Sequence, residues 1–295
     1  MQKKIETVKT LLDALPFIKE FNKEIVVIKY GGSAQTSPQL KEKFAEDILL
    51  MHLVGLRPVV VHGGGSKITE MLDALQIDTK FIEGQRVTTK EVMRIVEMIL
   101  SGEINNEIVS LLNSHGAKAI GVSGKDAHFI TAHAKDFSKW GLTGNINNVK
   151  ADVLLKLIDE KFIPVIAPIA AGEEMGHPGF NINADLCASY VAKAIGANKI
   201  IFLTDTPGVL NKDKELLDTL TEDQVEALKA DGTINGGMVP KVDACLEAIN
   251  GGVKKAHIID GRIEHSMLLE LFTSEGVGTV IKNVQKSDNV DSQSS

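Results

Sequence analysis

The stretch Ile25-Val26-Val27-Ile28-Lys29-Tyr30-Gly31-Gly32 decides the fold. Its unbroken apolar run, rich in β-branched residues, predicts a strand buried on both faces, and a glycine turn follows at once. The same order recurs in Pro58-Val59-Val60-Val61-His62-Gly63-Gly64-Gly65. Residues 40–53 between the two, and the chain after Gly65, carry apolar residues at helical spacing. Two such units in succession predict an α/β fold whose parallel sheet has helices on both faces.

The remaining chain continues this alternation. Further strands are predicted at 118–122, 163–166, 199–203, 256–259 and 279–282, and helices at 90–112, from Asp185, from Lys241 and up to Leu271. Residues 127–150 have mixed signals that favour hairpins. The stretch 172–179 contains glycine and proline, so we expect an N-terminal lobe of residues 22–180 and a C-terminal lobe of residues 181–285. The polar tail, residues 286–295, is expected to be disordered.

The N-terminal segment, residues 1–21, is predicted to be a helix. Val8, Leu11, Leu12 and Leu15 follow the i, i+3, i+4, i+7 pattern, and Pro16 is expected to interrupt or kink the helix. An apolar stripe on a terminal helix needs a covering surface. That surface is either the chain's own domain or another subunit, and the sequence leaves both open.

Composition narrows the class of protein. The 295 residues are 43% hydrophobic and 24% charged, as is usual for a globular protein, and the net charge of -7 argues against a nucleic-acid binder. The two cysteines, Cys187 and Cys245, make neither a disulfide framework nor a zinc cluster, and no protein metal site is predicted. No signal peptide or apolar run of about 20 residues is found, so we expect a cytoplasmic protein without a membrane span.

The glycine turns predict a site for an anion. Ligands of parallel sheets bind beyond the carboxyl ends of the strands, where glycine permits close backbone approach and a helix N-terminus offers free N–H groups. Gly32, Gly64 and Gly65 stand at such ends, although each turn alone could serve the fold only. The dinucleotide motif fails because residue 68 is Ile, and the GxxxxGK[ST] phosphate-loop motif is absent.

Charged residues flank these turns. Lys29 ends the first strand, and Lys241 opens a helix, where a cation is disfavoured unless an anion is near. In Asn181-Ile182-Asn183-Ala184-Asp185, alternation places the three polar residues on one side, although capping of the next helix is an alternative. Arg86 could bind a carboxylate through its fork of N–H groups or form a surface ion pair.

These residues lie in stretches that resemble the amino acid kinase family, over residues 20 to 283. The matching stretches are Lys29-Tyr30-Gly31-Gly32-Ser33, Val60-Val61-His62-Gly63-Gly64-Gly65, Gly84-Gln85-Arg86-Val87-Thr88, Asn181-Ile182-Asn183-Ala184-Asp185, Leu203-Thr204-Asp205-Thr206-Pro207-Gly208-Val209-Leu210 and Gly236-Gly237-Met238-Val239-Pro240-Lys241. Six motifs in one order make the resemblance specific, and Gln85 is a departure from the residue often found there.

The resemblance implies a three-layer αβα sandwich of two lobes around a mostly parallel eight-stranded sheet. Its N-terminal lobe would bind N-acetyl-L-glutamate, and its C-terminal lobe would bind ATP with Mg²⁺ held mainly by the phosphates. The γ-phosphoryl group would pass to the γ-carboxylate, a step of arginine biosynthesis.

Roles for single residues follow from the same resemblance. Catalytic roles fall to Lys29, Lys241, Asp185, Gly32 and Gly64. Substrate binding falls to Gly64, Gly65, Arg86, Asn181 and Asn183. Nucleotide binding falls to Thr204, Asp205, Gly208, Val209, Leu210, Gly237 and Met238.

The N-terminal segment 1–21 and the stretches 257–262 and 269–279 resemble the arginine-inhibited, hexameric members. This implies a trimer of dimers interlaced through the N-terminal helix, with L-arginine as inhibitor near Phe17, Lys212, His257, Glu270 and Gly276. A helix that only stabilises a dimer is the alternative. The rival functions are a kinase of the family acting on another acid or phosphate, a non-catalytic nucleotide-binding module, and a dinucleotide-dependent dehydrogenase.

Overall fold

A computed structural model of the chain describes residues 2–273 and 276–283. An eight-stranded sheet runs through its centre in the order β12-β14-β13-β11-β1-β2-β8-β5. Only β13 and β14 pair antiparallel, and every other neighbouring pair is parallel. The strands are β1 (Ile25–Tyr30), β2 (Arg57–His62), β5 (Ala119–Ser123), β8 (Ile163–Ala167), β11 (Lys199–Thr204), β12 (Thr219–Leu220), β13 (Lys255–Asp260) and β14 (Thr279–Lys282). The predicted mostly parallel sheet is confirmed.

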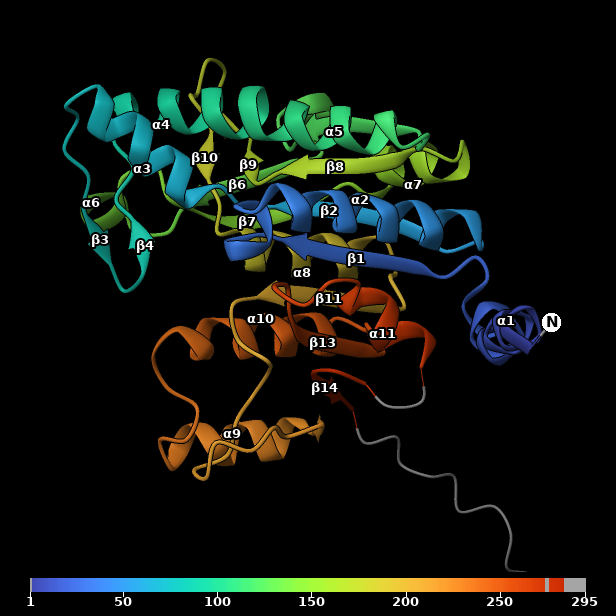
Figure 1. Cartoon of the computed structure of the whole chain (residues 1–295). Helices are drawn as coiled ribbons and strands as arrows, with labels where there is room; N and C mark the ends of the chain where they lie inside the picture. The colour runs from blue at the N-terminus through green and yellow to red at the C-terminus, as the bar shows by residue number, and fades with distance from the viewer. Residues whose placement is uncertain (1, 274–275, 284–295) are drawn as a thin grey trace, which may run out of the picture.

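Helices cover both faces of this sheet, which gives the three layers (Figure 1). One face carries α2 (Pro38–Leu53), α5 (Asn105–Ser114) and α11 (Ser266–Phe272), and the other carries α8 (Ala184–Ala194) and α10 (Val239–Asn250). The further helices are α3 (Gly65–Ala74), α4 (Lys90–Glu97), α6 (Phe137–Trp140), α7 (Ala151–Asp159) and α9 (Glu222–Ala230). The helices of the two layers contact the strands of the sheet, as the helical spacing of their apolar residues predicts.

Smaller antiparallel pairs lie beyond the carboxyl end of the sheet. They are β3 (Phe81–Ile82) with β4 (Gln85–Arg86), β6 (Ile130–Ala134) with β7 (Gly144–Val149), and β9 (Ile169–Ala170) with β10 (Phe180–Asn181). The β6–β7 pair confirms the hairpin expected within residues 127–150. Residues 172–179 form the loop between β9 and β10, and the division into two lobes there remains a prediction.

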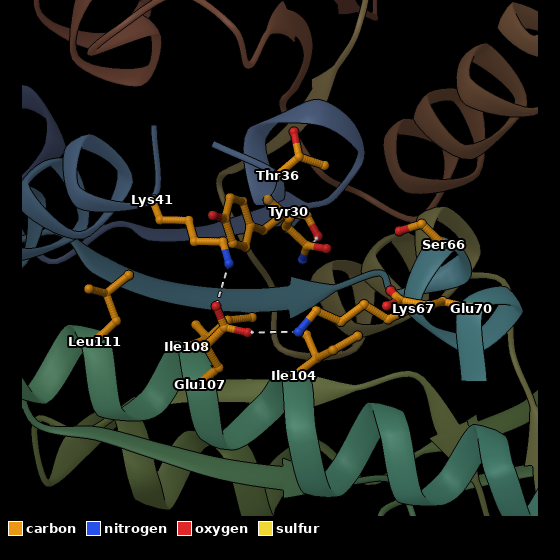
Figure 2. Close-up of a pocket in the computed structure, with 11 residues that line it drawn as sticks. Tyr30, Thr36, Lys41, Ser66, Lys67, Glu70, Ile104, Glu107, Ile108 and Leu111 are labelled. Carbon is orange, nitrogen blue, oxygen red and sulfur yellow. Dashed lines mark hydrogen bonds and ion pairs between the residues drawn. The ribbon is translucent and has the colours of Figure 1, made fainter. Parts of the chain in front are cut away.

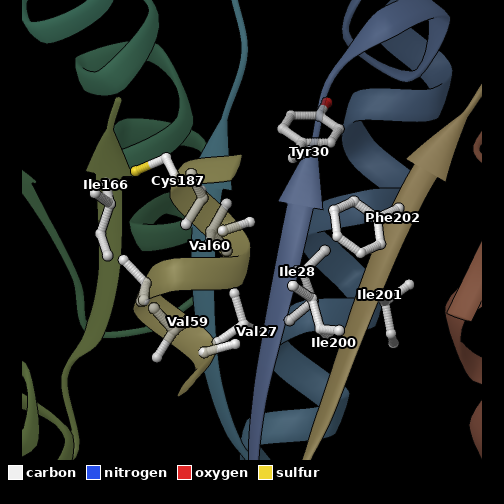
Figure 3. Close-up of a cluster of buried hydrophobic side chains, with 14 of the residues drawn as sticks. Val27, Ile28, Tyr30, Val59, Val60, Ile166, Cys187, Ile200, Ile201 and Phe202 are labelled. Carbon is white, nitrogen blue, oxygen red and sulfur yellow. The ribbon is translucent and has the colours of Figure 1, made fainter. Parts of the chain in front are cut away.

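The core is centred on β1 and β2 (Figure 3). Val27, Ile28, Val59 and Val60 have no solvent exposure, and Cys187 of α8 packs among them as a small apolar residue. Full burial of a Val or Ile side chain stabilises by roughly 1.5–3 kcal/mol, so the β-branched runs are a main source of stability. The rigid centre holds the carboxyl ends of the strands, where the glycine turns begin.

The N-terminal helix α1 spans Gln2–Phe21, so Pro16 does not interrupt it, and the alternative of a kink at Pro16 stays a prediction. A proline removes one backbone hydrogen bond, and packing at the end of the helix offsets that loss. The Phe21 and Phe272 rings lie 6.1 Å apart, and the Lys199 ammonium lies 3.8 Å from the Phe21 ring. Val8 and Leu12 stay more than half exposed, so the described part of the chain leaves these two side chains uncovered.

Several elements of the fold were not predicted. Among them are α7, the β3–β4 and β9–β10 pairs, strand β12 and helix α9. A π-helical turn, η2 (Met98–Ile104), joins α4 to α5 within the long helix expected at 90–112.

Within the described residues, no helix is long and apolar enough to cross a membrane. The tail predicted to be disordered lies outside the described residues.

Candidate active site

The two glycine turns lie side by side because β1 and β2 are neighbouring parallel strands. The backbone N–H of Gly63 donates to the carbonyl of Tyr30 over 2.8 Å. Gly32 has φ +66, and a Cβ atom there would collide with the Asp205 carboxylate. Gly64 caps α3, whose first residue, Gly65, has open space around its Cα atom. The turns therefore leave room and free N–H groups for an anion at one point of the sheet edge.

Three predicted charged residues meet above these turns. The Nζ atom of Lys29 lies 3.0 Å from Oδ1 of Asp185, and the Nζ atom of Lys241 lies 3.8 Å from Oδ2. A Cβ atom at Gly31 would lie 2.9 Å from the Lys29 ammonium, so glycine is needed for this lysine to reach its place. Two cations share one carboxylate, and the excess positive charge suits a phosphoryl group.

Asp185 remains ionised in this setting. Burial acts to raise the pKa of its carboxyl, but the charges of Lys29 and Lys241 outweigh burial and hold that pKa below its usual value. The carboxylate therefore fixes both ammonium groups. It is not a proton donor at neutral pH.

A cavity of about 400 Å³ opens beside the three charges. Both lysines line it, together with Gly32 and Asn235. The other lining residues belong to the C-terminal stretches that resemble the family: Leu203, Thr204, Asp205, Thr206, Gly237 and Met238. Gly208 and Val209 lie elsewhere, against Thr279, and Leu210 pairs with Leu216. The structure thus brings part of the predicted nucleotide site next to the lysines.

Arg86 is buried, with 6% exposure, at the end of β4. Its guanidinium donates to the carbonyl of Gly65 over 2.9 Å, and to the hydroxyls of Thr69 (2.8 Å) and Thr79 (3.1 Å). Burial lowers the pKa of Arg86, and the charge of Asp73 acts the other way. Because these hydrogen bonds all go to uncharged oxygens, the cation is held in place for an anionic ligand.

Asn181 and Asn183 have different surroundings. The amide of Asn181 donates to the hydroxyl of Thr88 over 3.1 Å, on the same side as Arg86. The side-chain oxygen of Asn183 accepts from the N–H groups of Asp185 and Leu186, so it caps α8. The capping interpretation of the Asn-rich stretch therefore holds for Asn183.

His62 and Asn105 support the second glycine turn and were not singled out from the sequence. The Nδ1–H of His62 donates to the carbonyl of Gly63 over 2.9 Å, and its Nε2 accepts from the Asn105 amide over 3.1 Å. Burial lowers the pKa of His62 to about 4, so the ring is neutral. A Cβ atom at Gly64 would collide with the side chains of Leu100 and Ile104 of η2. Only the HGGG sequence around His62 could have drawn attention to this support.

Lys67 follows the turn but is not directed to it. It forms ion pairs with Glu103 (2.6 Å) and Glu107 (3.2 Å), and Glu107 also binds Lys41. Figure 2 shows Lys67 and Lys41 converging on Glu107 beside a pocket of about 320 Å³ that Tyr30 and Ile104 help to line. These bonds tie α2, α3 and α5 together, so Lys67 contributes to structure.

A third cavity, of about 580 Å³, is lined by residues of β12, β13 and β14. His257, Glu270 and Gly276 line it, with Lys255 and Lys282, whereas Phe17 and Lys212 do not. The Glu270 carboxylate binds His257 at 2.7 Å and accepts from the N–H of Val277, and Lys212 pairs with Asp231. Three of the five predicted effector residues therefore share one cavity.

Comparison with known proteins places the chain in a family. The model of the amino acid kinase family matches residues 24–260, which include the glycine turns, Arg86 and Asp185. The chain belongs to the amino acid kinase family. Membership makes it an enzyme of the kinase class, and the matched residues include most of the site described above.

Relatives with curated names agree. An acetylglutamate kinase from Sulfurimonas denitrificans is 84% identical over 281 residues, covering 95% of this chain and 99% of the relative. Acetylglutamate kinases from a Nitratiruptor species and from Campylobacter fetus are 70% and 54% identical, covering 95% and 96% of this chain and 99% and 100% of the relatives.

Solved structures share the fold. A Streptococcus mutans protein has a TM-score of 0.75 at 28% identity and covers 88% of this chain and 99% of its own. N-acetylglutamate synthase from Neisseria gonorrhoeae, complexed with coenzyme A and N-acetyl-glutamate, has a TM-score of 0.82 at 23% identity, over 94% of this chain and 63% of that longer one. At that identity the likeness shows the fold alone.

Proposed function

We propose that this enzyme transfers the γ-phosphoryl group of ATP to the γ-carboxylate of N-acetyl-L-glutamate. The product is N-acetyl-L-glutamyl 5-phosphate, an intermediate of arginine biosynthesis. The observation that carries the proposal is that Asp185 holds Lys29 and Lys241 beside two glycine turns. The second of these turns is contacted by the buried Arg86, which donates to the carbonyl of Gly65. The names of relatives at 84% to 54% identity support this substrate.

The reaction needs little proton transfer. A free carboxylate has a pKa of about 4.3, so the attacking oxygen is already ionised at neutral pH. The obstacle is repulsion between two anions and the charge on the moving phosphoryl group. Catalysis then rests on positioning and on positive charge, as in other phosphoryl transfers.

The lysines meet this need from two sides. Lys29, from the end of β1, would contact the transferring group, and Lys241, from the first turn of α10, would contact the leaving phosphate. Free N–H groups near Gly32 and Gly64 would bind the equatorial oxygens. Asp185 holds both ammonium groups in place.

The acid would lie in the N-terminal lobe, residues 22–180, with the nucleotide in residues 181–285. Arg86 and Asn181, together with Gly64 and Gly65, would bind the part of the substrate that carries the α-carboxylate. Asn183 would contribute indirectly, by capping α8.

The nucleotide would use the cavity beside the lysines. Thr204, Asp205, Gly237 and Met238 line it, whereas Gly208, Val209 and Leu210, which were also expected to bind the nucleotide, do not. Mg²⁺ keeps several waters and is commonly carried by substrate phosphates, so it would enter with ATP and neutralise charge there.

The choice of acid is tested by trapping the acyl phosphate with hydroxylamine. The purified enzyme is given ATP, Mg²⁺ and one acid, either N-acetyl-L-glutamate, L-glutamate, L-aspartate or L-2-aminoadipate, and the hydroxamate is measured. We expect the highest kcat/KM with N-acetyl-L-glutamate. A higher kcat/KM with another acid would assign the enzyme to that substrate instead.

We further propose inhibition by L-arginine and assembly as a trimer of dimers through α1. Support comes from the exposed stripe with Val8 and Leu12, and from the cavity that His257 and Glu270 line. Phe17 and Lys212 would approach the effector only in the assembled or bound state. Deletion of residues 1–20 should yield dimers with a weaker response to arginine, measured by light scattering and inhibition curves. A truncated hexamer would contradict the role of α1.

A further inference from the structure

We propose that the buried hydroxyls of Thr88 and Thr143 form a proton-ordered link that positions Asn181 and Arg86 for the acid substrate. The inference rests on the proposed function and deepens it, since it concerns how the enzyme recognises N-acetyl-L-glutamate. Neither threonine would touch the reacting atoms. Both act through other residues and are positioning residues.

The link joins three segments that lie far apart in the sequence. The Thr143 hydroxyl lies 2.6 Å from the carbonyl oxygen of Arg86 and 3.0 Å from the Thr88 hydroxyl. The Thr88 hydroxyl lies 3.2 Å from the same carbonyl and 3.1 Å from the amide nitrogen of Asn181. Thr88 has no solvent exposure and Thr143 has 4%, so water does not supply these bonds.

Counting protons fixes the direction of the link. The two hydroxyls have one proton each, and the Arg86 carbonyl has none. Thr143 donates its proton to the carbonyl of Arg86 over 2.6 Å. Thr88 then donates its proton either to the Thr143 hydroxyl or to the same carbonyl. Both protons are then used, so Asn181 must donate to Thr88.

This direction settles how the Asn181 amide is turned. Its nitrogen faces Thr88, which leaves its oxygen and its second N–H for another partner. Such a pair suits a ligand that carries a carboxylate next to an acylated amine, because the carboxylate accepts and the amide N–H donates. The link thereby specifies an N-acyl amino acid at the side held by Arg86.

The backbone is built to bring the three segments together. Thr88 N–H donates to the Trp140 carbonyl over 3.0 Å, and Leu142 N–H donates to the Thr88 carbonyl over 2.7 Å. Gly141, between them, has φ +62, and a Cβ atom there would lie 2.5 Å from the Thr88 carbonyl. The close approach requires glycine at that position, so the geometry of the hydroxyl pair is set by the chain itself.

The test compares Thr143→Val with Thr143→Ser in the full-length enzyme. Valine keeps the shape and removes the hydroxyl, whereas serine keeps the hydroxyl. We expect Thr143→Val to raise the KM for N-acetyl-L-glutamate about tenfold or more while the KM for ATP changes less than about twofold. Thr143→Ser should stay near wild type, and Thr131→Val on β6 is the control for loss of a hydroxyl outside the link.

Two results would overturn the proposal. One is an unchanged KM for the acid in a folded Thr143→Val enzyme, and the other is an equal rise in both KM values, which marks a general structural role. Hydrogen exchange of the Asn181 side-chain amide, followed by NMR, adds a test that does not depend on catalysis. The Asn181 side-chain amide protons should exchange slowly in wild type and Thr143→Ser and fast in Thr143→Val, and equal exchange in all three would refute the link. If the Asn181 amide protons exchange slowly but the enzyme is inactive on N-acetyl-L-glutamate, the proposed function is wrong and the hydroxyl link stands.

Discussion

The Nζ atom of Lys29 lies 3.0 Å from Oδ1 of Asp185, and the other oxygen of that carboxylate faces Lys241 at 3.8 Å. The lysines come from β1 and α10, which lie near opposite ends of the chain. One buried carboxylate thus sets the positions of two cations beside the cavity that we propose for the nucleotide. The activity of the enzyme should depend on this arrangement and on the groups that support it.

Replacement of Asp185 by Asn should lower kcat by roughly 100-fold. The change keeps the shape but removes the charge that holds the two ammonium groups, which then repel each other. The rate of hydroxamate formation at saturating substrates measures the effect. Asp243→Asn, which removes an exposed carboxylate of α10 paired with Lys229, is the matched control and should keep the wild-type rate. Activity of Asp185→Asn close to that of the control would contradict the role of Asp185.

Lys29→Ala and Lys67→Ala should differ sharply, although both lysines stand beside glycine turns. Lys29 faces the site, and its loss should reduce kcat by roughly 100-fold or more. Lys67 is bound to Glu103 and Glu107, so its loss should leave kcat within about threefold and cost at most about 1 kcal/mol of stability. Steady-state rates and urea unfolding separate the two effects. Wild-type turnover by Lys29→Ala would rule out contact with the transferring group.

Arg86→Lys should raise the KM for N-acetyl-L-glutamate by at least about tenfold with little change in the KM for ATP. A lysine cannot keep the three hydrogen bonds to Gly65, Thr69 and Thr79 while it also pairs with a carboxylate. Arg57→Lys, at an exposed ion pair with Asp159, is the control. Equal changes in both KM values would show that Arg86 supports the fold in general and has no specific role for the acid.

His62 should make the free energy of unfolding depend on pH. Its pKa is about 4 in the folded chain, below the ordinary value of 6.5. From pH 6.5 downward the unfolded chain binds a proton that the folded chain does not, so stability falls until about pH 4, by about 3 kcal/mol in total. Urea unfolding across this range should show a shallower fall for His62→Asn than for wild type. The exposed His128→Asn is the control, and identical pH curves for wild type and His62→Asn would contradict a neutral buried His62.

The strands and the charged residues of the site could be predicted because they obey local rules. Buried parallel strands read as apolar runs, and Lys29 stands where such a run ends at a ligand edge. Asp185 and Lys241 stand near helix starts, where charge has a known preference.

The supporting residues could not be predicted in the same way. Thr88 pairs with Thr143, and His62 with Asn105, across long stretches of the chain, and nothing in their local sequence marks the pairing. Pro16 is a case in which a local rule misled. The rule predicted an interruption or a kink, but the helix is not interrupted, and Phe21 at its end packs against Phe272. Tertiary contacts, more than propensity, decided these positions.

We propose that the γ-carboxylate of N-acetyl-L-glutamate attacks the γ-phosphorus of ATP. The most direct test uses substrate that carries heavy oxygen in the γ-carboxylate. Hydroxylamine cleaves the acyl phosphate at its carbonyl carbon, so the released phosphate keeps the oxygen that made the attack. We expect phosphate with one heavy oxygen, and phosphate without the label would rule out attack by the carboxylate.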